Sequence, residues 1–171
     1  MSKISKIDAA RRQLETAITL FFNSKDPISI HTLSAASSEL CNDLLSDHLD
    51  KDGWMDILVK SAVKPEFQKE FKCIMRKAQN FFKHADKDPK AIFDYKSLIT
   101  EIHLFFTIDD YRRLTGERTP LMLIYQSWYM LSNPHHFQDE FKKQLEQFSH
   151  INPSDKLSFY SDSLAIRHRI F

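Results

Sequence analysis

The chain has 171 residues, a length that suits one domain, and its 42% hydrophobic residues are enough to build a sizeable core. It contains only 2 glycines, and because tight β-turns depend on glycine, this composition disfavours all-β and α/β folds. The net charge of +1 provides no strong overall field to attract nucleic acid. The sequence therefore predicts one all-α domain over residues 1–171, an up-and-down helical bundle of about six to eight helices.

Two long helices are predicted at the start of the chain, over residues 5–23 and 27–48. In both, apolar side chains recur every three or four residues, which is the helical period. The second helix is rich in small residues from Ser34 to Ser38, and because small side chains let another helix approach closely, we expect it near the bundle centre. His31 follows the start of this helix, where the helix dipole favours a neutral imidazole. It is either a buried or capping residue or part of a binding site.

The segment from Pro65 to Pro89 has the clearest helical pattern, and a less regular stretch, residues 47–65, precedes it. The irregular stretch is predicted to contain a short helix and could cover a site as a lid. In the regular segment, the spacing of the apolar residues predicts one long amphipathic helix with a buried face. Those residues are Phe67, Phe71, Ile74, Met75, Ala78, Phe81, Phe82 and Ala85.

The polar side of this predicted helix carries Arg76, Asn80 and His84, each four residues after the one before. Side chains at this spacing are neighbours on a helix surface, so the three should form a ladder. Arginine offers a fixed cation, asparagine a donor and an acceptor, and histidine a group that titrates near neutral pH. Such a set could hold a phosphodiester and move a proton. The alternative interpretation is an ordinary solvated flank of the helix.

The second half of the chain is predicted to be helical as well. A helix over residues 96–115 ends at Gly116, and another begins at Pro120. Residues 121–131 are apolar nearly all round, so this helix should be buried on all sides. It is either the core of the bundle or covered by a second subunit, and we favour the second subunit. A seventh helix over residues 137–148 and a last short helix in the tail to Phe171 complete the prediction.

No feature of the sequence indicates a membrane segment, a metal site or a cofactor. The amino terminus, MSKISKIDAARRQ, has no apolar signal core. The apolar run at residues 121–131 is far shorter than the roughly 20 residues that a membrane-spanning helix needs. Cys41 and Cys73 lack the spacing of a redox or zinc pair, and we interpret them as reduced. The sequence predicts a cytoplasmic protein.

A helical bundle with a basic, polar and histidine motif on a late core helix resembles the HEPN superfamily. The motif of that superfamily is an arginine, a polar residue, a short spacer and a histidine. Two segments, HTLSAASSEL (His31–Leu40) and NFFKHADKDP (Asn80–Pro89), are also similar to bacterial helical proteins near that superfamily. Here seven residues separate Arg76 from His84, one more than the usual spacer, and Lys77 stands where the family prefers Asn, Asp or His.

The resemblance implies a homodimer and, in many members of the superfamily, a metal-independent RNase. In such an enzyme His84 would be the general acid or base, Asn80 would orient it, and Arg76 would stabilise the phosphate charge. RNA would then be a partner.

Three functions remain open from the sequence. The first is an HEPN-like, non-enzymatic helical module that forms a homodimer or binds a partner protein, and we favour it because common catalytic motifs are absent. The second is the RNase. The third is a small-ligand or nucleotide site near His31 and His84, beneath residues 47–65, with Lys83 and Asp86 as further ligand-binding candidates.

Overall fold

The computed structural model describes residues 3–86 and 88–170, and all regular structure within them is helical, which confirms the all-α prediction. These residues form nine α-helices instead of the predicted six to eight. None of the described helices combines the length and apolarity needed to cross a bilayer. The helices are α1 (Lys6–Phe22), α2 (Pro27–Leu49), α3 (Trp54–Ala62), α4 (Gln68–Met75), α5 (Lys77–Lys83), α6 (Leu98–Thr115), α7 (Pro120–Ser132), α8 (Asp139–Leu145) and α9 (Lys156–Ile170). Between these helices lie three 3-10 turns, η1 (Pro65–Phe67), η2 (Pro134–His136) and η3 (Glu146–Phe148). Phe171, the last residue of the predicted tail helix, is outside the described residues.

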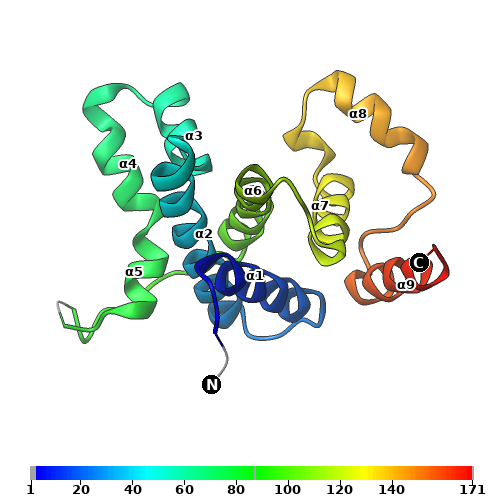
Figure 1. The fold of residues 1–171 in the computed structure, drawn as a ribbon, viewed down its shortest axis with the longest axis horizontal. Coiled ribbons are helices and arrows are strands. Elements are labelled where there is room, and N and C mark those ends of the chain that lie inside the picture. Colours follow the sequence, from blue (N-terminus) through cyan, green and yellow to red (C-terminus); the bar gives the residue numbers. More distant parts are fainter. Residues whose placement is uncertain (1–2, 87, 171) are drawn as a thin grey trace.

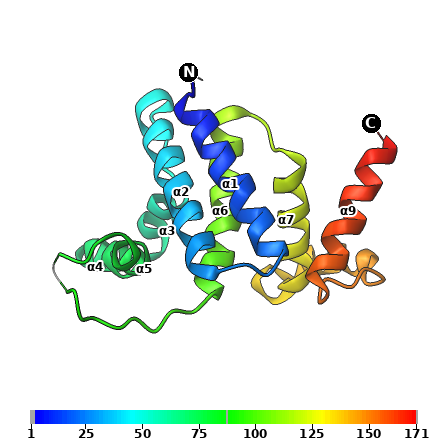
Figure 2. The ribbon, with the colours of Figure 1, turned by 90° about the horizontal axis from the view of Figure 1, so that it is seen from below.

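Four helices, α1, α2, α6 and α7, stand side by side at the centre of the molecule (Figures 1 and 2). α4 and α5 lie at one end of the molecule, beyond α2, and α8 and α9 lie at the opposite end, beyond α7 (Figure 1). α2 packs against both α1 and α6, as its small side chains predict. Ser34, Ala35 and Ser37 are buried there, and the Ser37 hydroxyl donates to the backbone oxygen of Ala10 at 2.9 Å.

The apolar core lies between α1, α2, α6 and α7 and includes one residue of α9. At its centre, Phe21 and Phe22 of α1 pack edge-on against Tyr125 and Trp128 of α7, with ring centroids 4.8 to 6.0 Å apart. Aromatic pairs of this kind stabilise a core by about 0.5–1.5 kcal/mol beyond the burial of their area. Phe22 also stacks on Tyr160 of α9 at 4.7 Å, so the same cluster attaches the last helix.

The apolar helix α7 is covered mainly by its own chain. Met122, Tyr125 and Trp128 are buried, and the helix packs against α1, α6 and α9. Leu123, 48% exposed, is the large apolar side chain of α7 that faces away from these neighbours. The sequence analysis favoured a second subunit as the cover. Because the chain itself provides the cover, α7 supplies no argument for a homodimer.

The prediction of one helix over residues 65–89 is wrong. The segment begins with η1, and the helix is interrupted at Arg76 (φ −87°, ψ −1°), which ends α4 and precedes α5. The break lets each half follow its own neighbour, since α4 packs on α3 and α5 packs on α2. The predicted buried face is only partly buried, since Ala78 is buried and Phe67 and Ile74 are 53% and 60% exposed. The other large members of that face, Phe71, Met75, Phe81 and Phe82, are half-buried.

The helix ends follow the predicted chemistry more closely. Ser5 caps α1 through reciprocal hydrogen bonds with Asp8. Asp26 caps α2, and Pro27 occupies its first position, where a missing N–H costs nothing. Gly116 ends α6 with φ of 80°, a left-handed conformation that glycine adopts without strain.

Candidate functional site

A polar cavity of about 360 Å³ lies between α2, α3, α5 and α6. α3, which belongs to the stretch predicted to cover a site, forms one of its walls. The lining side chains are Ala35, Ser38, Glu39, Asn42 and Asp43 from α2, Trp54, Met55 and Asp56 from α3, Arg76 and Gln79 from the start of α5, and His103 and Asp110 from α6. Most of these side chains are polar, and four of the polar ones (Ser38, Gln79, His103 and Asp110) are nine-tenths buried or more.

His103 is a nearly buried titratable group of the cavity wall, with 5% of its surface exposed. Its Nδ1 lies 3.0 Å from the Ser34 hydroxyl and 3.4 Å from the Thr107 hydroxyl. The Thr107 hydroxyl donates its own hydrogen to the backbone oxygen of His103 at 2.7 Å, so towards Nδ1 it can only accept. The Ser34 hydroxyl can donate or accept, so the Thr107 contact favours the tautomer with the proton on Nδ1, which leaves Nε2 as the acceptor. Among the described residues, Nε2 has no hydrogen-bond partner.

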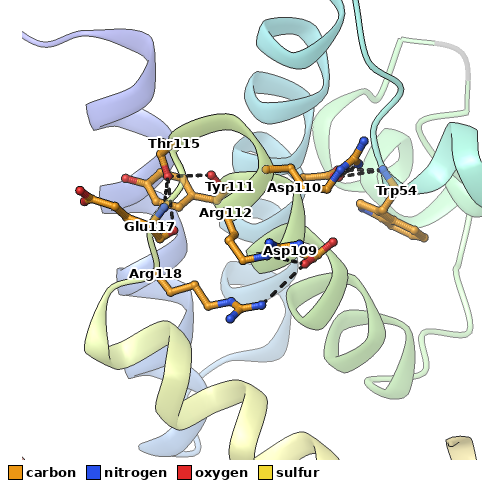
Figure 3. Close-up of polar contacts among 9 residues, drawn as sticks. Trp54, Asp109, Asp110, Tyr111, Arg112, Thr115, Glu117 and Arg118 are labelled. Atoms are coloured by element: carbon orange, nitrogen blue, oxygen red, sulfur yellow. Dashed lines mark hydrogen bonds and ion pairs between the residues drawn. The ribbon is translucent and has the colours of Figure 1, made fainter. Parts of the chain in front are cut away.

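Asp110 fixes the start of α3 to α6. Its two carboxylate oxygens accept hydrogen bonds from the backbone N–H of Trp54 at 2.9 and 3.0 Å, as Figure 3 shows. The Trp54 indole N–H donates to Ser38 on α2 at 3.2 Å, and its ring stacks on Phe106. Gly53 lies beside this contact, and a Cβ at that position would require the end of the Asn42 side chain to shift. The α3 wall of the cavity is thus held by polar contacts to two other helices.

Burial moves the pKa values of the inner wall in a consistent direction, against charge. It lowers the pKa of His103 to about 3, with the nearby His31 ring adding to the effect. It raises the pKa of Asp110 to about 6, although the Trp54 N–H and the Arg113 guanidinium oppose the shift. At neutral pH His103 is therefore an uncharged hydrogen-bond acceptor. A base this weak is poorly matched to proton abstraction near pH 7.

The outer wall of the cavity carries charges, most of which are already compensated. Glu39 pairs with Lys83 at 3.1 Å and Asp56 pairs with Lys72 at 2.5 Å. The Arg113 guanidinium lies 3.0 Å from Asp110. In the part of the chain that the structure describes, this leaves Asp43 and Arg76 as the lining charges without an ion pair.

The three residues of the predicted ladder line two different hollows, with Asn80 and His84 in the same one. Arg76 lines the cavity described above, whereas Asn80 and His84 line another hollow, of about 520 Å³. His84 follows the last residue of α5 with extended backbone (φ −131°, ψ 131°), so it is not on the helix. All three side chains are exposed. The backbone keeps the i, i+4 relation, since the Asn80 N–H donates to the Arg76 oxygen at 2.9 Å and the His84 N–H to the Asn80 oxygen at 3.1 Å.

The residues predicted to bind a ligand are also dispersed. His31 is 1% exposed, which agrees with its interpretation as a buried residue. Its Nδ1 lies 3.0 Å from the Thr100 hydroxyl. Its Nε2 is buried with no partner among the described residues, and burial lowers its pKa to about 4. Lys83 pairs with Glu39 at the cavity rim, and Asp86 lines the hollow that holds His84. The structure therefore does not gather these residues into one pocket.

Sequence reasoning missed His103, Asp110 and the cavity role of Trp54. A signal was present on α6, where Thr100, His103, Thr107 and Asp110 follow one another at steps of three, four and three residues. This spacing places them on one helix face. Such a polar stripe is usually solvated, but here all four side chains are buried. A buried polar stripe of this kind points to a specific role for the face that carries it.

Comparison of the chain with protein-family models, curated proteins and solved structures gave no match, so no relative assigns a role to the cavity. Among the described residues, no group of three or more His, Cys, Asp or Glu side chains is arranged to hold a metal ion.

The raised pKa of Asp110 gives the first testable prediction. Because the native carboxyl holds its proton more tightly than the unfolded one, its contribution to the free energy of unfolding falls as pH rises from 3.8 to about 6. His103 acts in the opposite direction, since its lowered pKa removes stability as pH falls below 6.5 towards about 3. The backbone amide signal of Trp54 should shift with a midpoint near pH 6 in an NMR titration.

The Asp110→Asn variant should lose this transition, whereas Asp109→Asn, which removes a neighbouring half-exposed carboxylate, should keep it. A Trp54 transition that persists in Asp110→Asn, or one centred near pH 3.8, would contradict the assignment.

Proposed function

We propose that the protein is a binding module for a small polar ligand, held in the cavity between α2, α3, α5 and α6. The observation that carries this proposal is the unpartnered Nε2 of His103, on a nearly buried ring that lines the cavity. This nitrogen is not one of the buried side-chain atoms without a partner, so it is accessible from the cavity. A ligand that donates a hydrogen bond to Nε2 would take the place of water there.

The size and rigidity of the cavity support binding of a small molecule. Its volume of about 360 Å³ falls at the lower end of the range for small-molecule sites. The Trp54 wall is fixed in advance by hydrogen bonds to Ser38 and Asp110. A preformed wall lowers the entropy cost of binding. Arg76 is the only basic side chain among the lining residues, which disfavours a nucleotide with several phosphate groups.

Binding fits the inner wall better than catalysis does. The pKa of His103, lowered to about 3 by burial, makes it a weak base, and Asp110 is engaged by Trp54 and Arg113. His103 is therefore poorly matched to proton transfer near neutral pH, and the hydrogen bonds of Asp110 give it a structural role. Both are well suited to fixed hydrogen bonding.

The two tryptophans of the chain supply an internal comparison for a binding test. Trp54 lines the cavity, whereas Trp128 lies in the α7 core with its indole N–H on the Pro153 carbonyl at 2.9 Å. In an NMR screen of small polar compounds, a ligand of the cavity should shift the indole signal of Trp54 and leave that of Trp128 in place. His103→Phe should weaken binding about tenfold, because the lost hydrogen bond involves a buried acceptor.

The exposed His135→Phe serves as the matched control and should bind like the original protein. A screen in which Trp54 never shifts, or in which His103→Phe binds every hit unchanged, would contradict the proposal.

The RNase suggested by the HEPN resemblance is a second candidate. It is favoured by one observation: Asn80 and His84 share a hollow with Lys77, so a base, an amide and a cation meet there. A homodimer, which the resemblance implies, would bring two such hollows together. If this candidate is correct, the protein should cleave a mixed pool of RNAs in EDTA, and His84→Ala should abolish cleavage while the exposed His135→Ala retains it. No cleavage by the original protein, or equal cleavage by His84→Ala, would exclude it.

A further inference from the structure

A cavity of about 550 Å³ lies at the end of the molecule that carries α8 and α9, away from α4 and α5 (Figure 1). It is bounded by α7, by the end of α8 with η3, by the turn that follows η3, and by α9. Its described lining shares no residue with the polar cavity of the candidate site. Half of the described lining side chains are apolar, namely Met130, Leu131, Leu145, Phe148, Ile151 and Phe159.

The apolar side chains of this cavity are only partly covered by the chain. Phe159 is the exception, since it is 8% exposed and packs nearly parallel to Phe22 with ring centroids 6.4 Å apart. Phe148 is 41% exposed, and Met130 is half-buried. Four of the six also line a neighbouring hollow of about 510 Å³, namely Leu131, Leu145, Phe148 and Ile151. The chain therefore leaves apolar surface open here, which favours an occupant that removes this surface from water.

The size of the cavity favours a small molecule over a helix of a partner protein. Small-molecule sites have volumes of about 300–1,000 Å³. A helix with its side chains is about 10–12 Å across and rises about 5.4 Å per turn, so two turns need roughly 850 Å³ or more. A volume of about 550 Å³ accommodates a small molecule but not two turns of a helix.

The polar side chains of the lining are mostly uncharged. Ser127 on α7, Ser158 on α9 and Asn152 before it provide hydroxyl and amide groups. The described lining includes the carboxylate of Asp162 and the imidazole of His150 but no lysine or arginine. The Asp162 Oδ2 accepts a hydrogen bond from the Ser158 hydroxyl at 3.3 Å. Because a negative group at the wall repels an anion, the lining disfavours a ligand with a carboxylate or a phosphate.

We propose that this cavity is a second ligand site, which binds a small, uncharged and largely apolar molecule. Such a molecule would cover the open parts of Met130 and Phe148, and the removal of apolar surface from water would drive binding. The lining hydroxyls can hydrogen-bond a hydroxyl or a carbonyl group of the ligand. The site has its own lining residues, so it does not rest on the function proposed above.

Three methionines allow the two cavities to be followed separately. Met130 lines the apolar cavity, Met55 lines the polar cavity, and Met122 is buried in the core. In protein labelled at the methionine methyl groups, their NMR signals report on the three regions. The probes are 1-octanol, which is neutral and largely apolar, octanoate, which adds a charge to a chain of the same length, and triethylene glycol, which is neutral and polar.

1-Octanol should shift the Met130 methyl signal and leave the Met122 and Met55 signals in place. It should bind at least about tenfold more tightly than triethylene glycol, because its methylene groups leave water more favourably. Octanoate should bind about threefold or more weakly than 1-octanol, and Asp162→Asn should reduce this difference.

Two serine variants test where the molecule binds. Ser127→Phe adds a ring at the wall of the cavity and should weaken 1-octanol binding by about tenfold, because the ring takes up part of the volume. The Met122 signal checks that the fold is unchanged. Ser46→Phe, at an exposed serine of α2 that lines neither cavity, is the matched control and should bind 1-octanol like the original protein.

Four results would overturn this proposal. They are a Met130 signal that 1-octanol does not shift, equal binding of triethylene glycol and 1-octanol, equal binding of octanoate and 1-octanol, and unchanged binding of 1-octanol by Ser127→Phe. Because Met55 reports on the polar cavity independently, each of these failures is distinguishable from a failure of the proposed function.

Discussion

The hydrogen bonds from the backbone N–H of Trp54 to both oxygens of Asp110 are the contact on which the cavity depends. They attach the start of α3 to α6 (Figure 3). In the chain, α4 and α5 lie between these two helices. With α3 in this position, the Trp54 ring reaches Ser38 of α2 and closes one side of the cavity. A carboxylate that accepts two bonds inside a folded protein is expensive to bury, and its raised pKa reflects that cost.

The buried polar face of α6 is costly for stability as a whole. His103 and Asp110 both hold ionisable groups in surroundings that disfavour charge, and the neighbouring His31 has a buried nitrogen without a partner among the described residues. Apolar residues of similar volume would pack α2 on α6 without this cost. The aromatic cluster around Trp128, where α7 packs on α1, contributes apolar burial against this cost. A polar face kept at such a cost is consistent with a role in binding.

Local rules predicted much of the fold and little of the site. Helix ends such as those at Ser5 and Gly116 depend on neighbouring residues alone, so the sequence specifies them directly. The break at Arg76 depends on which helices α4 and α5 meet, and no periodicity in residues 65–89 reports that. The polar stripe of α6 was visible in the sequence, but a polar stripe usually faces water. Only the packing of α6 against α2 shows that His103 lines an enclosed cavity.

The central claim is that His103 offers a bare Nε2 lone pair to a ligand. The ring nitrogen chemical shifts of this residue, recorded by long-range ¹H–¹⁵N correlation between about pH 5 and pH 8, test it most directly. The account predicts a neutral ring with the proton on Nδ1 at every pH in this window, because Ser34 and Thr107 both surround Nδ1 and burial holds the pKa near 3. A proton on Nε2, or a ring that becomes charged within the window, would contradict it.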